Sequence, residues 1–445
     1  MKAAQALGAW IGRRRIGTLA YDNEQGLFAF HYANDWASDP DGYPLSPPLG
    51  FARDAKETDA FHSAKVRRFF ANLLPEGEAL DDAARASKVS KSNLMGLMRA
   101  IGRETSGAIS LLPADASPDD VEDRERPITA AELSQRIRER SEVPFSVWDG
   151  KVRISIAGLQ DKIAVYRDPE GELFLVEGRL ASTHILKPAP RGERTPFLIA
   201  NEHFCMRLAA ELGIPAAPVE IMRVPEPILL VERFDRQVHE GAVIKTHLID
   251  GCQALDLGPG YKYERHLGSG RDVAHIRDGA SYPRLFGLTE LTASRAATRL
   301  KLLRWALFQY LIGNSDAHGK NISFFVRPYG LTLAPAYDLV AVNAYDHFET
   351  DLAMAIGDTF AIQEVRPYDW ADFAHRCGIN ARLMAREMQR LAEPASKSAR
   401  GVASWSGYTG EERQFLELVL VFVDQQARQL LRHAAEVPKI RREHV

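Results

Sequence analysis

The polar and apolar positions in the first quarter of the chain alternate over short segments separated by turn residues. Strands are predicted at residues 17–21 and 26–32, on either side of the turn residues 22–25. Helical spacing follows at about 63–74 and 93–101, and a further strand is predicted at 107–112. Residues 113–130, rich in proline and acidic side chains, predict a polar linker. The start of the chain is therefore expected to form a small mixed module.

A strand-rich block follows, and its order is informative. Strands are predicted at 151–156, 162–166, 173–176 and 183–188, with a hairpin turn at 168–171. A helix is expected over about 195–212, where Gly213 ends it, and two strands follow at 219–222 and 228–234. Strands with a lysine at the end of the fourth, then a helix, then two strands, is the order of a protein-kinase amino-terminal lobe.

From about residue 236 the pattern is mainly helical, and the clear exception is a hairpin over 322–337. The helix expected at about 293–312 carries Leu300, Leu303, Leu307 and Leu311 at helical spacing, so one of its faces should be buried. The pattern predicts an α+β, kinase-like two-lobe fold, with a β-rich amino-terminal lobe and a mainly α-helical carboxyl-terminal lobe.

Three polar residues around the predicted hairpin suggest chemistry. Asp316 and Asn321 stand in the loop before it, and Asp338 ends it. Phosphoryl transfer needs a carboxylate that accepts the hydroxyl proton, the role predicted for Asp316, and hard oxygen ligands for Mg²⁺, predicted to be Asn321 and Asp338. An Asp and an Asn in one loop are more often turn residues, but their place between a helix and a hairpin favours the kinase interpretation.

The nucleotide side of such a site is less distinctive. Lys187 is the candidate for the phosphate-binding lysine, although a solvated lysine at a strand end is about as frequent. Glu202 could pair with it, but a solvated glutamate on a helix face is the more frequent case. Residues 155–162 are the candidate phosphate loop despite their single glycine, with an ordinary β-turn as the alternative. His318 suggests a metal ligand, yet no second histidine stands at ligand spacing, so a loop-stabilising or phosphate-facing role is favoured.

Composition narrows the function classes. A chain of 445 residues with 45% hydrophobic and 26% charged residues predicts a soluble protein of two or three domains. The formal net charge of −3 gives no overall basic field for nucleic acid or membrane. Three widely spaced cysteines argue against a disulfide framework and for a reducing compartment. With no signal peptide and no apolar run long enough to span a bilayer, a cytoplasmic location is expected.

Taken together, these motifs resemble the HipA family of bacterial serine/threonine kinases, the toxin half of type II toxin–antitoxin modules. The resemblance runs from about residue 153 to 357. It is carried by the stretches Ile154 to Lys162, Thr183 to Lys187, Asn201 to Leu212, Val231 to Arg236, Cys252 to Leu255, Lys262 to Glu264, Leu311 to Asn321 and Pro335 to Asp338. The segment 258–287, glycine-rich and charged, fits the family only loosely and raises the question of whether it is ordered.

The resemblance implies roles for individual residues. Asp316 corresponds to the catalytic base, and Asn321 and Asp338 to the Mg²⁺ ligands. The residues implied to bind ATP are Ser155, Ala157, Gly158, Gln160, Lys162, Lys187, Gln253 and His318, with Glu232 and Phe234 on the adenine side. Ser155 falls on the serine that family members autophosphorylate to switch themselves off, and a dianion in this loop would compete with ATP for the same donors.

The resemblance also implies an organisation and partners. The expected parts are a HipA-type amino-terminal subdomain over 1–125, a nucleotide-binding lobe over 126–235 and a catalytic lobe over 236–445. The implied partners are a HipB-like helix-turn-helix antitoxin, through which DNA is contacted indirectly, and a protein substrate such as an aminoacyl-tRNA synthetase. Two alternatives stay open: a co-repressor with little catalysis, and a small-molecule phosphotransferase.

Overall fold

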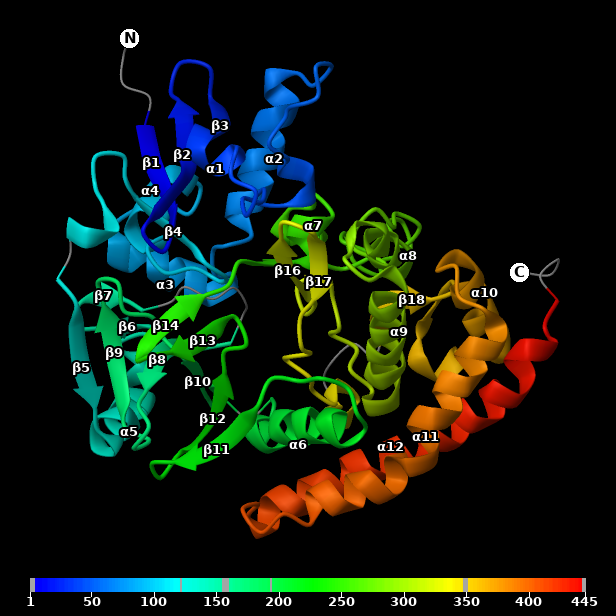
Figure 1. Ribbon diagram of the computed structural model, residues 1–445. Coiled ribbons are helices and arrows are strands. Elements are labelled where there is room, and N and C mark those ends of the chain that lie inside the picture. The colour runs from blue at the N-terminus through cyan, green and yellow to red at the C-terminus, as the bar shows by residue number, and fades with distance from the viewer. Residues whose placement is uncertain (1–4, 121, 154–159, 193, 347–350, 442–445) are drawn as a thin grey trace. The chain divides into compact units, whose positions relative to one another are not determined.

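The computed structural model describes residues 5–120, 122–153, 160–192, 194–346 and 351–441 (Figure 1). The chain forms two compact units. The first comprises Met1–Ala189, Met222–Pro259 and Phe324–Gly330, and the second Pro190–Ile221, Gly260–Ser323 and Leu331–Val445. The mixed helices and strands confirm the expected α+β class, and each unit is described in turn.

The first unit begins with a four-stranded antiparallel sheet in the order β3-β2-β1-β4. Its strands are β1 (Gln5–Ile11), β2 (Arg14–Asp22), β3 (Leu27–Tyr32) and β4 (Ile109–Pro113). Leu7, Ala9 and Leu19 are fully buried, as alternation along the strands requires. The helices of this region, in cyan and blue in Figure 1, are α1 (Asn34–Ala37), α2 (Asp59–Ala71), α3 (Gly77–Ser87) and α4 (Leu94–Ile101).

A six-stranded sheet has the order β11-β12-β10-β8-β9-β5. The strands are β5 (Arg124–Ile128), β8 (Ile163–Arg167), β9 (Leu173–Glu177), β10 (His184–Pro188), β11 (Val219–Arg223) and β12 (Pro227–Glu232). One face packs its apolar side chains, among them Val165, Leu186 and Leu230, with Leu133 and Ile137 of α5 (Ala130–Arg138). In the register, His184 lies opposite Glu232 and Lys187 opposite Leu229. Lys187 therefore points to the face opposite α5.

Two predictions about secondary structure were wrong. Part of the expected linker 113–130 forms β5, which pairs with β9 and buries Ile128. The carboxyl-terminal half also holds more strands than one hairpin: β13 (Arg236–His239), β14 (Ala242–Lys245), β15 (Leu248–Asp250), β18 (Asp351–Ile356) and β19 (Thr359–Ala361), besides β16 (Ser323–Arg327) and β17 (Gly330–Leu333). The missed strands β13, β14, β15, β18 and β19 do not alternate regularly between polar and apolar residues. The remaining described strands are β6 (Val147–Trp148) and β7 (Lys151–Val152).

The second unit is mainly helical. Its longer helices are α6 (Leu198–Glu211), α9 (Arg295–Ile312), α10 (Pro367–Arg376), α11 (Ala381–Ala403) and α12 (Gly410–Glu436), and α8 (Tyr282–Gly287) is short. Helices α11 and α12 lie side by side (Figure 1). In α9, Leu303, Leu307 and Leu311 are buried, as the spacing predicted. Helix α7 (Gly251–Ala254) belongs to the first unit.

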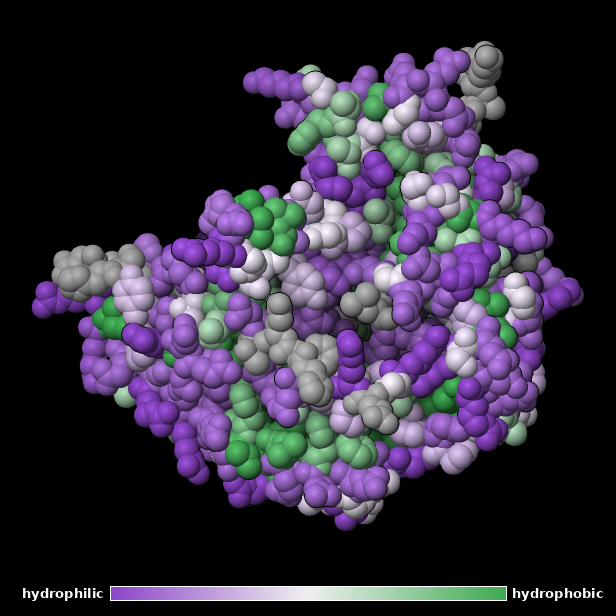
Figure 2. Space-filling model, turned by 180° about the vertical axis from the view of Figure 1, so that it is seen from behind, coloured by the Kyte–Doolittle hydropathy of each residue, from purple (hydrophilic) through white to green (hydrophobic). Residues whose placement is uncertain are grey.

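The three cysteines are buried, and the face of the molecule in Figure 2 is mainly hydrophilic. Cys205 and Cys377 of the second unit and Cys252 of the first are buried. Burial raises the pKa of the Cys205 and Cys377 thiols. On the face shown in Figure 2 hydrophilic residues predominate, with apolar residues in small separate groups. Among the described residues, no helix is long and apolar enough to cross a membrane.

Candidate active site

The loop that carries Asp316 begins where α9 ends. Gly313 caps the helix in the left-handed region at φ +67°, and a Cβ there would overlap the Phe422 ring. Asn314 donates to Gln309 Oε1 over 2.9 Å and accepts the Asp316 N–H over 3.2 Å. Residues 311–315 and 317–322 are buried, whereas Asp316 is exposed. The fold thus exposes the Asp316 carboxylate on a loop whose other residues are buried.

Asn321 and Asp338 lie together in the second unit. The Asn321 amide donates to Asp338 Oδ2 over 2.8 Å, and Asn321 Oδ1 accepts the His318 N–H over 3.1 Å. Asp338 has φ +58°, a left-handed conformation that an aspartate tolerates better than most residues. Backbone conformations of this kind cluster at active sites and ligand-binding positions. The structure therefore brings together the two residues predicted as metal ligands.

The donor set of this pair suits Mg²⁺. The ion prefers oxygen ligands and commonly takes only one or two of them from the protein, with water and phosphate completing the octahedron. Asp338 offers a carboxylate, and Asn321 Oδ1 has a second lone pair beside the one facing His318. Among the described residues there is no group of three or more His, Cys, Asp or Glu side chains suited to a metal ion. Any metal held here would rely on this two-residue set.

His318 lies inside the same loop. It is buried, and its Nδ1 accepts the Lys320 N–H over 3.3 Å. Burial, reinforced by the nearby Lys262 ammonium, lowers the pKa of His318 to about 3. The imidazole is therefore neutral at physiological pH. These hydrogen bonds stabilise the loop that carries Asp316 and Asn321, which is one of the two roles predicted for His318.

A residue that sequence reasoning did not single out contacts Asp316. The Tyr263 hydroxyl donates to Asp316 Oδ1 over 2.6 Å, and its ring lies edge-on to His318 with the centroids 5.1 Å apart. Tyr263 stands within the Lys262-Tyr263-Glu264 stretch already noted in the sequence. That stretch was the available signal, although its spacing from Asp316 says nothing about a contact.

The residues predicted for the nucleotide side lie in the first unit. Lys187 is buried on β10, and Glu232 is exposed at the end of β12. Phe234 packs edge-on against Phe325, with the centroids 6.0 Å apart. Gln160 donates to the Pro188 carbonyl over 3.3 Å, and Lys162 is buried. Ser155, Ala157 and Gly158 lie outside the described residues.

Two further sequence predictions can be compared with the structure. Gln253 is buried in the first unit, where its amide accepts the Asp250 N–H in a capping box and donates to the Phe69 carbonyl over 3.1 Å. These hydrogen bonds of Gln253 are structural. Glu202 was expected to be a solvated glutamate on a helix face, and this was wrong. Only 1% of Glu202 is exposed, because α6 is buried on nearly all sides.

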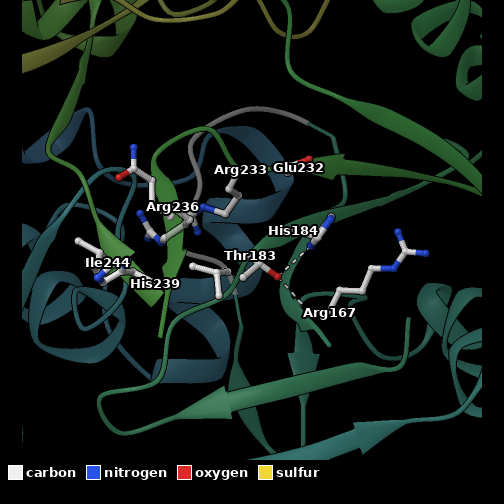
Figure 3. Close-up of a pocket in the computed structure, with 10 residues that line it drawn as sticks. Arg167, Thr183, His184, Glu232, Arg233, Arg236, His239 and Ile244 are labelled. Carbon is white, nitrogen blue, oxygen red and sulfur yellow. Dashed lines mark hydrogen bonds between the residues drawn. The ribbon is translucent and has the colours of Figure 1, made fainter. Parts of the chain in front are cut away.

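A cavity of about 750 Å³ lies at the other end of the β10–β12 pair (Figure 3). His184 and Glu232 line it from the sheet, and Val238, His239 and Ile244 from the β13–β14 hairpin. His184 is three residues from Lys187, so the two side chains point to opposite faces of the sheet. Thr183 and Arg233, next to the ends of β10 and β12, line the cavity too, so it lies at the strand ends rather than on one face of the sheet.

Arg233 and Arg236, which also line this cavity, belong to a buried ionic cluster of the first unit. Asp235 accepts two bonds from Arg233, of 3.0 and 2.9 Å, and one of 2.8 Å from Arg236. Burial alone would raise the pKa of Asp235, but the two guanidinium groups hold it below its usual range. Asp235 also accepts the Gly107 N–H over 2.8 Å, which ties the cluster to the segment before β4.

Comparison with known proteins gives consistent results. Residues 154–399 match the family model of the HipA-like C-terminal domain, and residues 7–112 match the HipA N-terminal domain. The serine/threonine-protein kinase toxin HipA of Shewanella oneidensis is 41% identical over 385 residues, which cover 86% of each chain. A solved complex of Shewanella oneidensis HipA with HipB and its operator DNA matches with a TM-score of 0.87 and 37% identity, over 98% of this chain and 100% of that one.

Proposed function

The chain belongs to the HipA family and is a serine/threonine-protein kinase, and on that premise we propose that it transfers the γ-phosphoryl group of ATP to a protein hydroxyl as the toxin of a toxin–antitoxin pair. The observation that carries this proposal is the loop after α9, which exposes Asp316 while burying its neighbours and places Asn321 against Asp338. This order of base, amide and acid is what phosphoryl transfer to a hydroxyl requires.

In this proposal Asp316 orients the substrate hydroxyl and accepts its proton. Asn321 and Asp338 would hold Mg²⁺, which when bound supplies charge neutralisation at the phosphate oxygens. The neutral His318 keeps the loop in shape without adding a charge beside the base. The work of the protein is thus mainly positioning and electrostatics.

We assign the ATP contacts to the residues that the family resemblance implies. Lys187 would bind phosphate, and the segment from Glu232 to Phe234 would meet the adenine. The further proposed contacts are Ser155, Ala157, Gly158, Gln160, Lys162, Gln253 and His318. Support comes from the place of Lys187, buried on β10 in the strand that precedes α6, which is the position of the phosphate-binding lysine in a kinase amino-terminal lobe.

We also propose that Ser155 is the site of autophosphorylation and that a HipB-like antitoxin is the partner. The similarity to a HipA solved with HipB and operator DNA supports the second point, and DNA would then be contacted mainly through the antitoxin. The formal net charge of −3 agrees with indirect contact. A translation factor such as an aminoacyl-tRNA synthetase is the proposed substrate. The buried thiols support a cytoplasmic location, since reduced cysteines persist in a reducing compartment.

The test follows the intact mass of the phosphatase-treated chain during incubation with ATP and Mg²⁺, beside Asp316→Asn and Ser155→Ala. The wild type should gain one phosphate, mapped to Ser155, and both variants should gain none. Asp316→Asn should still bind a fluorescent ATP analogue, because the substitution preserves shape and removes only the base. A wild type that starts without phosphate and gains none would favour the co-repressor or small-molecule alternatives. Transfer by Asp316→Asn at the wild-type rate would refute the assigned base.

A further inference from the structure

The Tyr263 hydroxyl lies 2.6 Å from Asp316 Oδ1. Backbone hydrogen bonds of the residues on either side of Tyr263 hold it in place. The Lys262 carbonyl accepts the Gly319 N–H over 2.9 Å, which ties the tyrosine segment to the loop of Asp316. On the other side, the Glu264 N–H donates to the Ala353 carbonyl over 2.9 Å. The tyrosine and the carboxylate are therefore parts of one hydrogen-bonded frame.

The Glu264 side chain strengthens this frame. Its Oε2 accepts the Ala355 N–H over 2.8 Å, and its Oε1 accepts from Arg277 over 2.7 Å. Glu264 is 3% exposed, so these are bonds in a buried environment, where a hydrogen bond is stronger than in water. The segment around residues 258–287, which the sequence left undecided, is described throughout, and it supplies both Tyr263 and Arg277.

Gly279 adds a steric support. It packs so closely on the Tyr263 carbonyl that a Cβ at this position would overlap the oxygen. On the ring side, His318 meets Tyr263 at 85°, an edge-to-face arrangement that limits rotation of the phenol. Tyr263 thus contacts Gly279 through its backbone and His318 through its ring, and its hydroxyl bonds to the Asp316 carboxylate.

From this geometry, and given the kinase function proposed above, we infer that Tyr263 is a positioning residue for the base: by donating to Oδ1 it fixes the rotamer in which the Asp316 carboxylate meets the substrate hydroxyl. A carboxylate on a surface loop otherwise has several rotamers, and each unproductive one lowers the rate. A donated hydrogen bond also stabilises the charged form that a base must have before it accepts a proton.

The experiment compares Tyr263→Phe with a matched control, Tyr261→Phe. Tyr261 is two residues away and exposed, and its ring stacks on His266 rather than on the loop of Asp316. Phosphate gain by the phosphatase-treated full-length chain is followed by mass under single-turnover conditions, over a range of ATP concentrations and from pH 5 to 8. Asp316→Asn is run beside them.

Tyr263→Phe should slow the maximal rate by about tenfold to a hundredfold, the range expected for losing a hydrogen bond to a charged group. The ATP concentration for half-maximal rate should change less than twofold, and the acid limb of the pH–rate profile should move to higher pH. Tyr261→Phe should behave as the wild type. If the role of Tyr263 were merely structural, Tyr263→Phe would change thermal unfolding or the ATP dependence. It would not shift the acid limb alone.

Three outcomes would overturn the inference. If Asp316→Asn is inactive and Tyr263→Phe matches the wild type in rate and pH profile, the inference fails while the proposed kinase function stands. If Tyr263→Phe is faster, the phenol blocks the base rather than positioning it. If the wild type gains no phosphate, the proposed function fails and the inference fails with it.

Discussion

Asn321 donates its amide to the Asp338 carboxylate over 2.8 Å, although the β16–β17 hairpin separates the two residues in the sequence. The bond links the end of the Asp316 loop to the residue after the hairpin. It also shows that the two proposed metal ligands are close enough to share one ion. A cation that binds between these residues competes with the hydrogen bond from Asn321 to Asp338. Its affinity therefore depends strongly on attraction by the negative charge of Asp338.

Replacing that charge should weaken metal binding. In Asp338→Asn the shape is kept while the negative charge is lost, so the Mg²⁺ concentration for half-maximal phosphate gain should rise at least tenfold, about 1.4 kcal/mol. The measurement is a Mg²⁺ titration of the phosphorylation rate at saturating ATP. Asp272→Asn, at an exposed position outside the site, is the matched control and should leave the titration unchanged. An unchanged Mg²⁺ dependence in Asp338→Asn would rule this residue out as a ligand.

The ionic cluster of the first unit predicts a large loss of stability. In Asp235→Ala the anion that accepts from Arg233 and Arg236 is removed, and two buried guanidinium groups lose a partner. Removing one member of a buried ion pair costs about 3–5 kcal/mol. Urea unfolding followed by circular dichroism measures the change.

The matched control is Asp123→Ala. Asp123 bonds to Arg179 over 2.7 Å at an exposed position, where an ion pair contributes about 0–1 kcal/mol. Similar losses in the two variants would contradict the importance given to burial. The contrast is informative because both carboxylates accept from arginine at nearly the same distance.

The packing of Gly279 on the Tyr263 carbonyl gives a separate prediction. In Gly279→Ala the new methyl group must push the two backbone segments apart, which should lower stability by about 1–3 kcal/mol. The phosphorylation rate should also fall, because Tyr263 moves relative to Asp316. Gly260→Ala is the control, since nothing lies near a Cβ at Gly260. A fully active Gly279→Ala would mean that the frame around Tyr263 adjusts without consequence.

His203 predicts a pH dependence of stability. Burial, with Arg207 nearby, lowers the pKa of His203 from 6.5 to about 4, and its Nδ1 lies 2.7 Å from the Tyr408 hydroxyl. The unfolded chain therefore binds a proton below pH 6.5 that the folded chain does not. The stability that the neutral His203 contributes is fully present above pH 6.5. It decreases as the pH falls toward 4, by about 1.4 kcal/mol per pH unit at most.

The measurement is the free energy of unfolding between pH 7.5 and 4.5 for the wild type and His203→Gln. The variant should be less stable at pH 7.5, and its difference from the wild type should shrink on acidification. His275→Gln, at an exposed position, should keep a constant difference. A difference between the wild type and His203→Gln that does not depend on pH would contradict the assigned protonation.

Local sequence patterns predicted helices and strands whose formation depends on residues close together in the sequence. The helix that precedes Asp316 and the strand that carries Lys187 both form where the pattern predicted them. The β13–β14 hairpin was missed because its strands, RQVH and AVIK, do not alternate between polar and apolar residues. The edge strand β5 was taken for linker because its polar residues face solvent.

The site shows the same limit. Asp316, Asn321 and Asp338 could be proposed because they cluster around one hairpin, whereas Tyr263 is 53 residues from Asp316 and no periodicity links them. Glu202 was misjudged because its helix is buried on nearly all sides, a property set by packing rather than by the residue. For Gln253, the Asp250-x-x-Gln253 pattern of a capping box was visible in the sequence and would have indicated its structural bonds.

The buried cysteines give each unit its own chemical reporter. A thiol reagent reaches Cys252 only when the first unit opens, and Cys205 or Cys377 only when the second does. Labelling rates resolved by peptide mass would therefore measure two opening equilibria in one native sample, without mutation or added dye. Equal rates would mean that the units open as one cooperative body, and unequal rates would identify the one that yields first.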